Sequence, residues 1–366
     1  MQLRICRDEE MKAFDEVFID KTKYGVKVQT SEYEEQGEYI IIDQGQGQIA
    51  GYTDREEGLF EDVPVVIFGD HTRVIKYVDE PFFLGADGVK VLRSKDKNAN
   101  YKYLYYALKS AKIPNTGYNR HFKWLKEVKI NYPDSNKQAE IVDVLDRVSD
   151  IISKREAEMQ ALDDLIKARF IELFGNPVLN PIGWPVKRLG DITTKIGSGA
   201  TPKGGKESYR EDGISLIRSM NVHNGKFEYK DLAHISDEQA ERLDNVTLEM
   251  DDVLLNITGA SVARCCIVPA DVLPARVNQH VCIVRCKEFI SPEFLNCLLI
   301  EDNYQDLLWG IAGSGATREA ITKQQVEDLQ IIIPPETMQR EFTTFVKQVD
   351  KSKVIWQKAI NIINYK

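Results

Sequence analysis

A seven-residue repeat of apolar side chains between Asp134 and Leu173 most constrains what this chain can fold into. The steps alternate between four and three, and the apolar positions are Ile141, Leu145, Val148, Ile152, Met159, Leu162, Ile166 and Leu173. Such spacing is typical of a coiled-coil seam. Arg155 and Arg169 occupy two further seam positions, where an aliphatic stem can pack while its charge reaches water. We therefore expect one long helix whose apolar stripe is covered by a second helix.

The chain supplies a second helix of the same pattern, from Gln339 to Ile363. Its apolar positions match Ile141, Leu145, Val148, Arg155, Met159 and Leu162 in order, and they are Phe342, Val346, Val349, Trp356, Ile360 and Ile363. The approach to each helix matches too, because Pro133 and Gln138 stand at the same offset as Pro334 and Gln339. A whole seam in register indicates an internal duplication, whereas two unrelated amphipathic helices would share this phase only by coincidence.

The segments before the two helices also repeat, as short apolar runs separated by polar turns and followed by a helix. In the first segment the predicted strands are 39–42, 65–68, 74–78 and 89–92, and the predicted helix is 100–109. In the second segment the predicted strands are 214–217, 253–257 and 281–284, and the predicted helix is 292–299. We therefore predict an α+β fold with two duplicated mixed α/β domains separated by a long antiparallel two-helix coiled coil.

Composition adds three expectations. The 366 residues contain no apolar run of 18, so no membrane-spanning helix is expected. The N-terminal residues lack the apolar centre of a signal peptide, which predicts a cytoplasmic protein whose six cysteines are reduced thiols. No Cys-x-x-Cys pair is present, so we expect these cysteines to pack in the core instead of binding zinc.

The net charge of −9 argues against a nucleic-acid partner, but the charge is unevenly distributed. Six cations face the single acid Glu127 in one short stretch, and they are Lys109, Lys112, Arg120, Lys123, Lys126 and Lys129. Local patches decide whether a surface contacts phosphate. The alternative for such a cluster is an ordinary solvated surface.

Motifs for catalysis are missing. The Gly-rich stretch 197–206 departs from the phosphate-binding loop, because its Gly204 is followed by Gly205 and only then by Lys206 and Glu207. We predict instead a basic loop that meets backbone phosphate. The tetrapeptide of adenine methyltransferases is absent, and Asp70-His71 has no matched nucleophile, so a hydrogen-bonding turn is favoured there. The sequence predicts a non-catalytic chain without a metal or cofactor of its own.

The sequence resembles the DNA-specificity (S) subunits of type I restriction–modification enzymes over essentially its whole length. The resemblance rests on Pro-x-x-x-x-Gln at the start of each helix, on the run 169–177 at the end of the first helix, and on Asn278-Gln279-His280 before a late strand. The second helix stops at Lys366, which makes it shorter than the first, so the overlap of the two helices sets the length of the pair.

The resemblance implies a division into target-recognition domain 1 (1–133), conserved spacer helix 1 (134–174), a linker with target-recognition domain 2 (175–333), and conserved spacer helix 2 (334–366). Each recognition domain would bind one half of a bipartite double-stranded DNA target, and the helix pair would fix the gap. Two methylation (M) subunits around the helices and restriction (R) subunits would use S-adenosylmethionine, ATP and Mg. The alternatives are a stand-alone DNA methyltransferase or nuclease, or a coiled-coil scaffold without DNA binding.

Arg and Lys read guanine in the major groove, and Asn and Gln read adenine. On that chemistry the base-reading candidates of the first domain are Gln44, Gln46, His71, Thr72 and Arg73, and those of the second are Arg218, Ser219, Asn221, Thr258, Ser261 and Gln279. The phosphate-binding candidates are Lys109, Arg120, Lys123, Lys203, Lys206 and Arg318. The alternative role is structural, with Gln44 and Gln46 forming a Gly-rich turn and residues 278–280 bonding to backbone.

Overall fold

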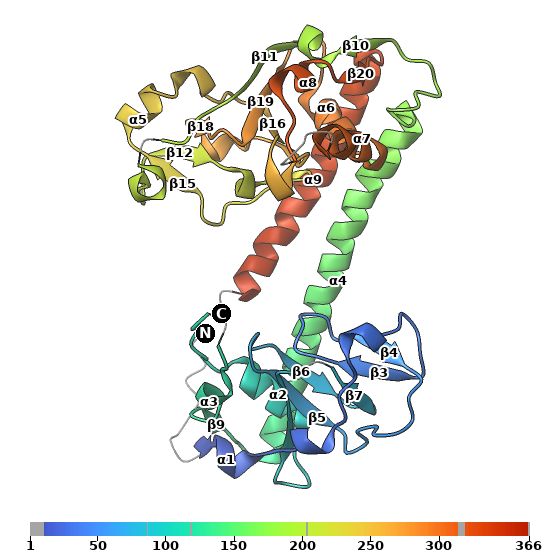
Figure 1. Cartoon of the computed structure of the whole chain (residues 1–366), viewed down its shortest axis with the longest axis vertical. Helices are drawn as coiled ribbons and strands as arrows, with labels where there is room; N and C mark the ends of the chain where they lie inside the picture. The colour runs from blue at the N-terminus through green and yellow to red at the C-terminus, as the bar shows by residue number, and fades with distance from the viewer. Residues whose placement is uncertain (1–10, 86, 118, 203, 314–318, 365–366) are drawn as a thin grey trace. The chain divides into compact units, whose positions relative to one another are not determined.

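The computed structural model describes residues 11–85, 87–117, 119–202, 204–313 and 319–364, and only the backbone of residues 206, 208 and 354–364. The chain divides into two compact units, residues 1–153 (unit 1) and residues 154–366 (unit 2). The division falls within one long helix, α4 (Ser135–Phe174), which Figure 1 shows in green. None of the described helices is long and apolar enough to cross a membrane.

Unit 1 contains a four-stranded sheet, a three-stranded sheet and a strand pair. The four-stranded sheet has the order β2 (Phe18–Asp20), β8 (Val89–Ser94), β5 (Val65–Gly69), β6 (Ile75–Val78). The three-stranded sheet has the order β4 (Gly51–Thr53), β3 (Tyr39–Ile42), β7 (Phe82–Leu84), and β1 (Met11–Ala13) pairs with β9 (Lys129–Asn131). The helices before α4 are α1 (Phe14–Val17), α2 (Tyr101–Lys109) and α3 (Phe122–Leu125).

Unit 2 repeats this arrangement. Its four-stranded sheet has the order β11 (Thr193–Ser198), β19 (Val281–Cys286), β16 (Val253–Asn256), β17 (Cys265–Ile267). Its three-stranded sheet has the order β15 (Ala233–Ile235), β12 (Ile214–Ile217), β18 (Ala275–Val277), and the strand pairs are β13 (Val222–His223) with β14 (Lys226–Phe227) and β10 (Val186–Arg188) with β20 (Gln330–Ile332). The helices are α5 (Asp237–Glu241), α6 (Pro292–Leu299), α7 (Asp302–Gly313), α8 (Lys323–Glu327) and α9 (Glu336–Asn364).

The two units share strand directions as well as strand order. In each, one pair of the three-stranded sheet is parallel, β3 with β7 and β12 with β18, and the pairs of the four-stranded sheet are antiparallel. The predicted duplication and α+β fold are therefore confirmed. The helix after the last long strand also begins alike, because Asn100 caps α2 and Ser291 caps α6 through a side-chain oxygen.

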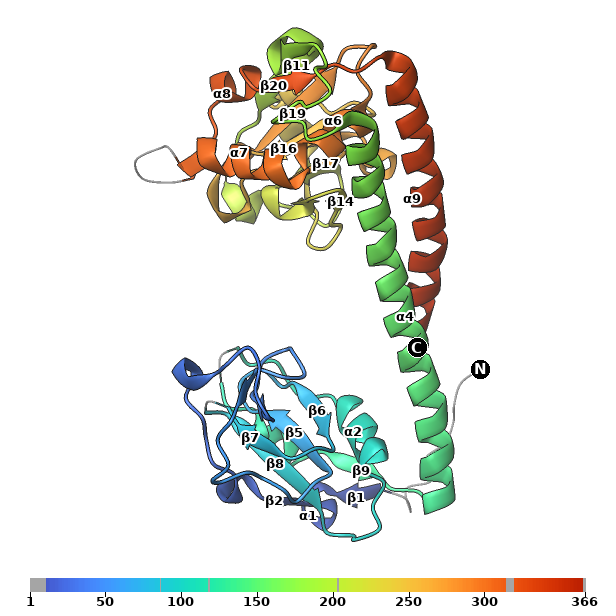
Figure 2. The same ribbon diagram turned by 90° about the vertical axis from the view of Figure 1, so that its right-hand side faces the viewer.

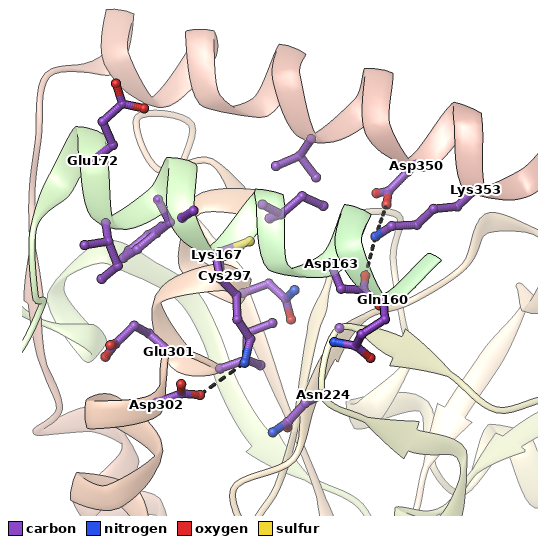
Figure 3. Close-up of a pocket in the computed structure, with 18 residues that line it drawn as sticks. Gln160, Asp163, Lys167, Glu172, Asn224, Cys297, Glu301, Asp302, Asp350 and Lys353 are labelled. Atoms are coloured by element: carbon purple, nitrogen blue, oxygen red, sulfur yellow. Dashed lines mark hydrogen bonds and ion pairs between the residues drawn. The ribbon is translucent and has the colours of Figure 1, made fainter. Parts of the chain in front are cut away.

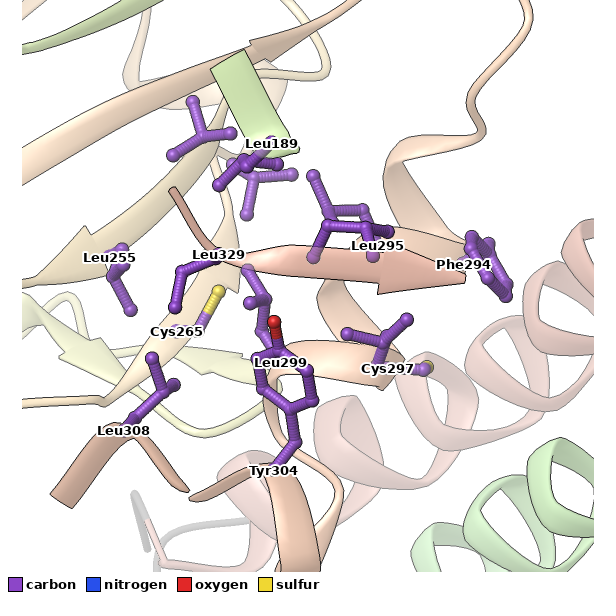
Figure 4. Packing of buried hydrophobic residues seen from close by; sticks show 14 of the residues in the cluster. Leu189, Leu255, Cys265, Phe294, Leu295, Cys297, Leu299, Tyr304, Leu308 and Leu329 are labelled. Carbon is purple, nitrogen blue, oxygen red and sulfur yellow. The ribbon is translucent and has the colours of Figure 1, made fainter. Parts of the chain in front are cut away.

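The core of unit 2 extends onto its two long helices through a cluster of four phenylalanines. Phe170 and Phe174 of α4 contact Phe294 of α6 and Phe342 of α9, with ring centroids 4.9–5.7 Å apart. Figure 4 shows Phe294, Leu295 and Leu299 of α6 beside strand and helix residues of this core. Aromatic clusters of this kind bury large apolar areas and fix the packing angle of their helices.

Within unit 2, α9 runs antiparallel to the C-terminal part of α4, and Figures 1 and 2 both show the two helices side by side. Near the start of α9, Arg169 Nη2 lies 2.6 Å from Glu341 Oε1. Further along α9, Lys353 forms an ion pair with Asp163, which precedes Arg169 on α4. The charge of the half-buried Arg169 therefore reaches across to the other helix.

The apolar stripe differs from a pure helix-to-helix seam at its first turns. Ile141 packs against the hydrophobic core of unit 1. Ile141 and Leu145 also line a groove beside Tyr106 of α2. Phe342, the counterpart of Ile141, packs on the core of unit 2 in the same way. The first turns of each long helix thus pack against the sheet domain that precedes it in sequence. That domain exposes apolar surface next to the strand before the helix.

The remaining seam positions differ in their burial. Half-buried on α4 are Val148, Ile152, Met159, Leu162 and Leu173, whereas Ile166 on α4 and Val346 and Val349 on α9 are buried. Trp356, Ile360 and Ile363 lie beyond the last residue whose side chain the structure describes.

Candidate nucleic-acid interface

In unit 1, three turns that follow strand ends are hydrogen-bonded to one another at one edge of the sheets. Gly85 N donates to Ile42 O at 2.8 Å, which joins the ends of the parallel strands β3 and β7. Asp70 N donates to Gly88 O at 2.6 Å, which joins the turn after β5 to the turn before β8. Loops held by a rigid sheet in this way are common positions for binding residues.

Gln44 is the residue that ties these turns together. Its Nε2 donates to Asp87 O at 2.9 Å, and its Oε1 accepts from His71 N at 3.1 Å. Thr72 Oγ1 donates to the carbonyl of Gln44 at 2.6 Å. The structure therefore brings the three candidates Gln44, His71 and Thr72 together, and the side chains of Gln44 and Thr72 make hydrogen bonds inside the protein.

A hollow of about 520 Å³ lies beside these turns and gathers four of the candidates, namely Gln46, Thr72, Arg73 and Lys109. Arg73 has a left-handed backbone (φ 61°), and its Nη1 donates to Ile113 O at 3.3 Å. Lys109 Nζ lies 3.1 Å from Tyr105 OH. An open hollow with cations at its rim suits a phosphate or a base edge.

A third cation lines this hollow and was not among the sequence candidates. Lys76 is buried, and burial lowers the pKa of its amine, while Asp43 at 3.4 Å opposes that shift. In β6, Lys76 takes an inward-facing position between Ile75 and Tyr77. A lysine in a strand is normally expected to face solvent, so the sequence does not indicate the buried position of Lys76.

Arg120 and Lys123 are exposed and lie outside the lining of this hollow. Arg120 is close enough to Asp87 to contribute to the lowered pKa of that carboxyl, after the larger effects of Lys27. Lys123 Nζ lies 4.9 Å above the ring of Trp124. Both side chains remain accessible to a phosphate backbone.

In unit 2, Arg218 follows β12 at the corresponding edge. Its guanidinium lies 5.2 Å from the ring centre of Tyr209, and its Nη2 donates to the carbonyl of Asp231. Its Nε is buried without a hydrogen-bond partner among the described residues. Ser219 is half-buried beside it, and its carbonyl accepts from Asn256 Nδ2 at 2.9 Å.

Asn221 differs from the sequence expectation of a base reader. It is 0% exposed, its Nδ2 donates to Glu228 O at 2.9 Å, and its Oδ1 accepts from Arg218 N at 3.1 Å. Buried amides make their bonds inside the fold because an unpaired amide there is costly. Asn221 therefore shapes the turn that carries Arg218.

Thr258 and Gln279 meet on either side of His280. Thr258 Oγ1 contacts His280 Nδ1, and Gln279 Nε2 lies 3.0 Å from His280 Nε2. Gln279 Oε1 accepts from the hydroxyl of Thr201. Ser261 is half-buried on the turn after Thr258. The candidates Lys203 and Arg318 and the side chain of Lys206 lie outside the described part of the chain.

A larger hollow of about 750 Å³ lies between α4, α6 and α9 and contains none of the candidates. Figure 3 shows its two lysines already paired, Lys167 with Asp302 at 3.1 Å and Lys353 with Asp163 and Asp350. Burial raises the pKa of its Cys297 to about 12, so that thiol stays protonated at neutral pH. Among the described residues, no group of three His, Cys, Asp or Glu could hold a metal ion.

Comparison with known proteins gives a consistent result. The type I restriction modification DNA specificity domain family matches residues 7–161 and 181–364. The specificity subunit of the type I restriction enzyme EcoR124I/EcoR124II from Escherichia coli is 22% identical over 90% of this chain and 83% of its own length. The MjaIX specificity subunit from Methanocaldococcus jannaschii is 24% identical over 65% of this chain and 58% of its own length.

Among solved structures, the S subunit of a type I restriction-modification system from M. genitalium has a similar fold. The TM-score is 0.59 at 17% sequence identity, and the match covers 97% of this chain and 92% of that one.

Proposed function

The chain belongs to the type I restriction-modification DNA specificity family, and we propose that it is the non-catalytic subunit that selects a bipartite DNA target. Unit 1 binds one half-site and unit 2 the other. Methylation subunits bind around the long helices and supply S-adenosylmethionine chemistry, and restriction subunits supply ATP- and Mg-dependent cleavage.

The observation that carries this proposal is the same sheet edge built twice from different turn residues. Unit 1 presents Gln46, Arg73 and Lys109 around a hollow, whereas unit 2 presents Arg218 and Gln279. Two domains that recognise different half-sites need the same fold but different turn residues. The side chains that contact base edges determine which DNA sequence is bound.

The direct test uses the purified chain with and without its methylation subunit. We expect no methyl transfer from labelled S-adenosylmethionine by the chain alone, and transfer to a bipartite target once the methylation subunit is added. Transfer by the chain alone would support a stand-alone methyltransferase. A complex that methylates DNA without sequence preference would support a scaffold role.

Replacement of Arg218 by alanine should weaken binding by about 1–3 kcal/mol and relax one half-site only. The reason is that Arg218 stacks on Tyr209 and is held by Asp231 at the edge of unit 2, where it can reach one base pair. The measurement is methylation profiling of DNA by the reconstituted complex. Arg188→Ala, which removes the same charge from β10, serves as control. Unchanged preferences at both half-sites would rule out Arg218 as a base reader.

Inserting four residues into the middle of α4 should widen the recognised gap by one or two base pairs. Four residues add about 6 Å of helix, compared with about 3.4 Å per base pair along DNA. They turn the following segment by only about 40°, close to the twist of one base pair. Methylome profiling measures the gap, and an insertion of two residues, which turns the helix by about 200°, should abolish activity. A gap that stays constant in the four-residue variant would contradict the proposal that the length of the helices sets the distance between the half-sites.

A further inference from the structure

Three turns at the edge of unit 2 are connected by an unbroken chain of side-chain contacts. This series of side-chain hydrogen bonds connects Thr201 to Gln279, Gln279 to His280, and His280 to Thr258. It therefore links the loop after β11, the turn before β19 and the turn after β16. Each of these turns follows or precedes a strand of the four-stranded sheet of unit 2.

The backbone of the central turn is fixed independently of that chain. Asn278 N donates to Ile217 O at 3.1 Å, and Gly199 N donates to Asn278 O at 3.1 Å. Asn278 Oδ1 accepts from His280 N at 3.0 Å, and Ile257 N donates to His280 O at 3.0 Å. Gln279 is half-buried between these two anchored residues. Its side chain thus starts from a backbone position that is already ordered, which reduces the entropy lost on binding.

The contacts fix the donors and acceptors along the chain. The amide nitrogen of Gln279 can only donate, so His280 Nε2 accepts and the imidazole proton is on Nδ1, where it donates to Thr258 Oγ1. The Thr201 hydroxyl donates to Gln279 Oε1. An amide group has two N–H donors and an oxygen with two acceptor sites. Each partner uses one of them, which leaves Gln279 one N–H and one acceptor site.

We propose that Gln279 reads an adenine in the half-site of unit 2 and that His280 and Thr201 are the positioning residues that set its amide. This inference rests on the proposed function of unit 2 as a DNA reader. Adenine offers an N7 acceptor and an N6 amino donor in the major groove, which match one N–H and one carbonyl oxygen. Guanine offers two acceptors, and the remaining groups of Gln279 satisfy only one of them.

Gln44 of unit 1, in the turn after β3, also bonds across turns but is placed differently from Gln279, which follows β18. Gln44 bonds to the backbone of Asp87 and His71, and an added Cβ at Gly88 would lie 2.7 Å from its Oε1 and 2.8 Å from its Nε2. Its amide is enclosed by the turn that it holds, whereas the partners of Gln279 are side chains. The proposal therefore concerns unit 2 alone.

The test uses the full chain in complex with its methylation subunit and a set of DNA duplexes. In these duplexes each base pair of the unit 2 half-site is replaced in turn by the other three. Gln279→Glu exchanges the donor for an acceptor, which repels adenine N7 and suits the amino group of cytosine. We expect adenine binding to fall about ten- to a hundredfold at one position, with preferences at all other positions unchanged. Gln348→Glu, at an exposed position of α9, is the control for the added charge.

His280→Leu removes the acceptor for Gln279 and should reduce the adenine preference at that same position. His280→Gln restores an acceptor and should recover the preference. Thr201→Val removes only a hydroxyl from a loop, so it tests the same point if the His280 variants fold poorly. Base preferences that Gln279→Glu leaves unchanged at every position would overturn the proposal. A wild-type complex that binds no bipartite target would instead contradict the proposed function.

Discussion

Replacing Phe342 by alanine is expected to lower the free energy of unfolding of unit 2 by about 3–5 kcal/mol. Phe342 is 0% exposed, and its ring centre lies 5.6 Å from that of Phe170 and 5.5 Å from that of Phe174. Its removal leaves a cavity where α9, α4 and α6 meet, and three helices cannot close such a gap without losing other contacts. Urea denaturation followed by circular dichroism measures the change.

Phe345→Ala provides the matched comparison, because Phe345 lies one turn later on α9 and is only partly buried against the same cluster. The Phe345→Ala variant should lose less than half as much free energy of unfolding as the Phe342→Ala variant. Equal decreases in the two variants would mean that the four-phenylalanine cluster does not hold α9 in place.

Replacing Asp252 by alanine is expected to lower the free energy of unfolding by about 3–5 kcal/mol, because it breaks a buried ion pair and leaves Arg285 with only the exposed carboxylate of Glu249. Asp252 is 0% exposed, and its two oxygens accept from Arg285 Nε at 2.7 Å and Nη2 at 2.8 Å. Hydrogen bonding to Asp252 is the largest cause of the raised pKa of Arg285. Thermal denaturation of the full chain gives the measurement.

Glu238→Ala removes a carboxylate that also pairs with an arginine, Arg242, but the two side chains are 75% and 62% exposed. Solvent screens that pair, so the expected loss of unfolding free energy is below about 1 kcal/mol. A loss at Asp252 as small as the loss at Glu238 would show that the buried pair contributes little to the stability of unit 2.

The parts of the fold that sequence predicts well are those with a strong local period. The strands at Tyr39–Ile42 and Ile214–Ile217 and the helix Pro292–Leu299 have the bounds that their apolar runs and caps indicate. The long helix α4 follows from its uninterrupted repeat. In contrast, β7 (Phe82–Leu84) went unpredicted, because three apolar residues after a proline carry no period and become a strand only by pairing with β3.

In the candidate interface too, the sequence predicts the features that depend on local order but not those that depend on tertiary contacts. The positions of Arg73, Arg218 and Gln279 after strand ends followed from the order of apolar runs and turns, and the structure brings each to a sheet edge. The burial of Asn221 and Lys76 could not be predicted, since it depends on strands that are distant in sequence. Nor could the docking of Ile141 on unit 1, because the repeat alone cannot say which surface covers the stripe.

The cross-bonded turns have a consequence for how a new DNA target can arise. In unit 1, Gln44 bonds to two other turns, and in unit 2 Gln279 shares its amide with Thr201 and His280. Substitutions at such contacting positions are not additive, so a change in one turn depends on what stands in the others. Stepwise drift is therefore a poor route to altered recognition. An exchange of the whole set of turns, carried on the common framework, preserves every internal bond at once.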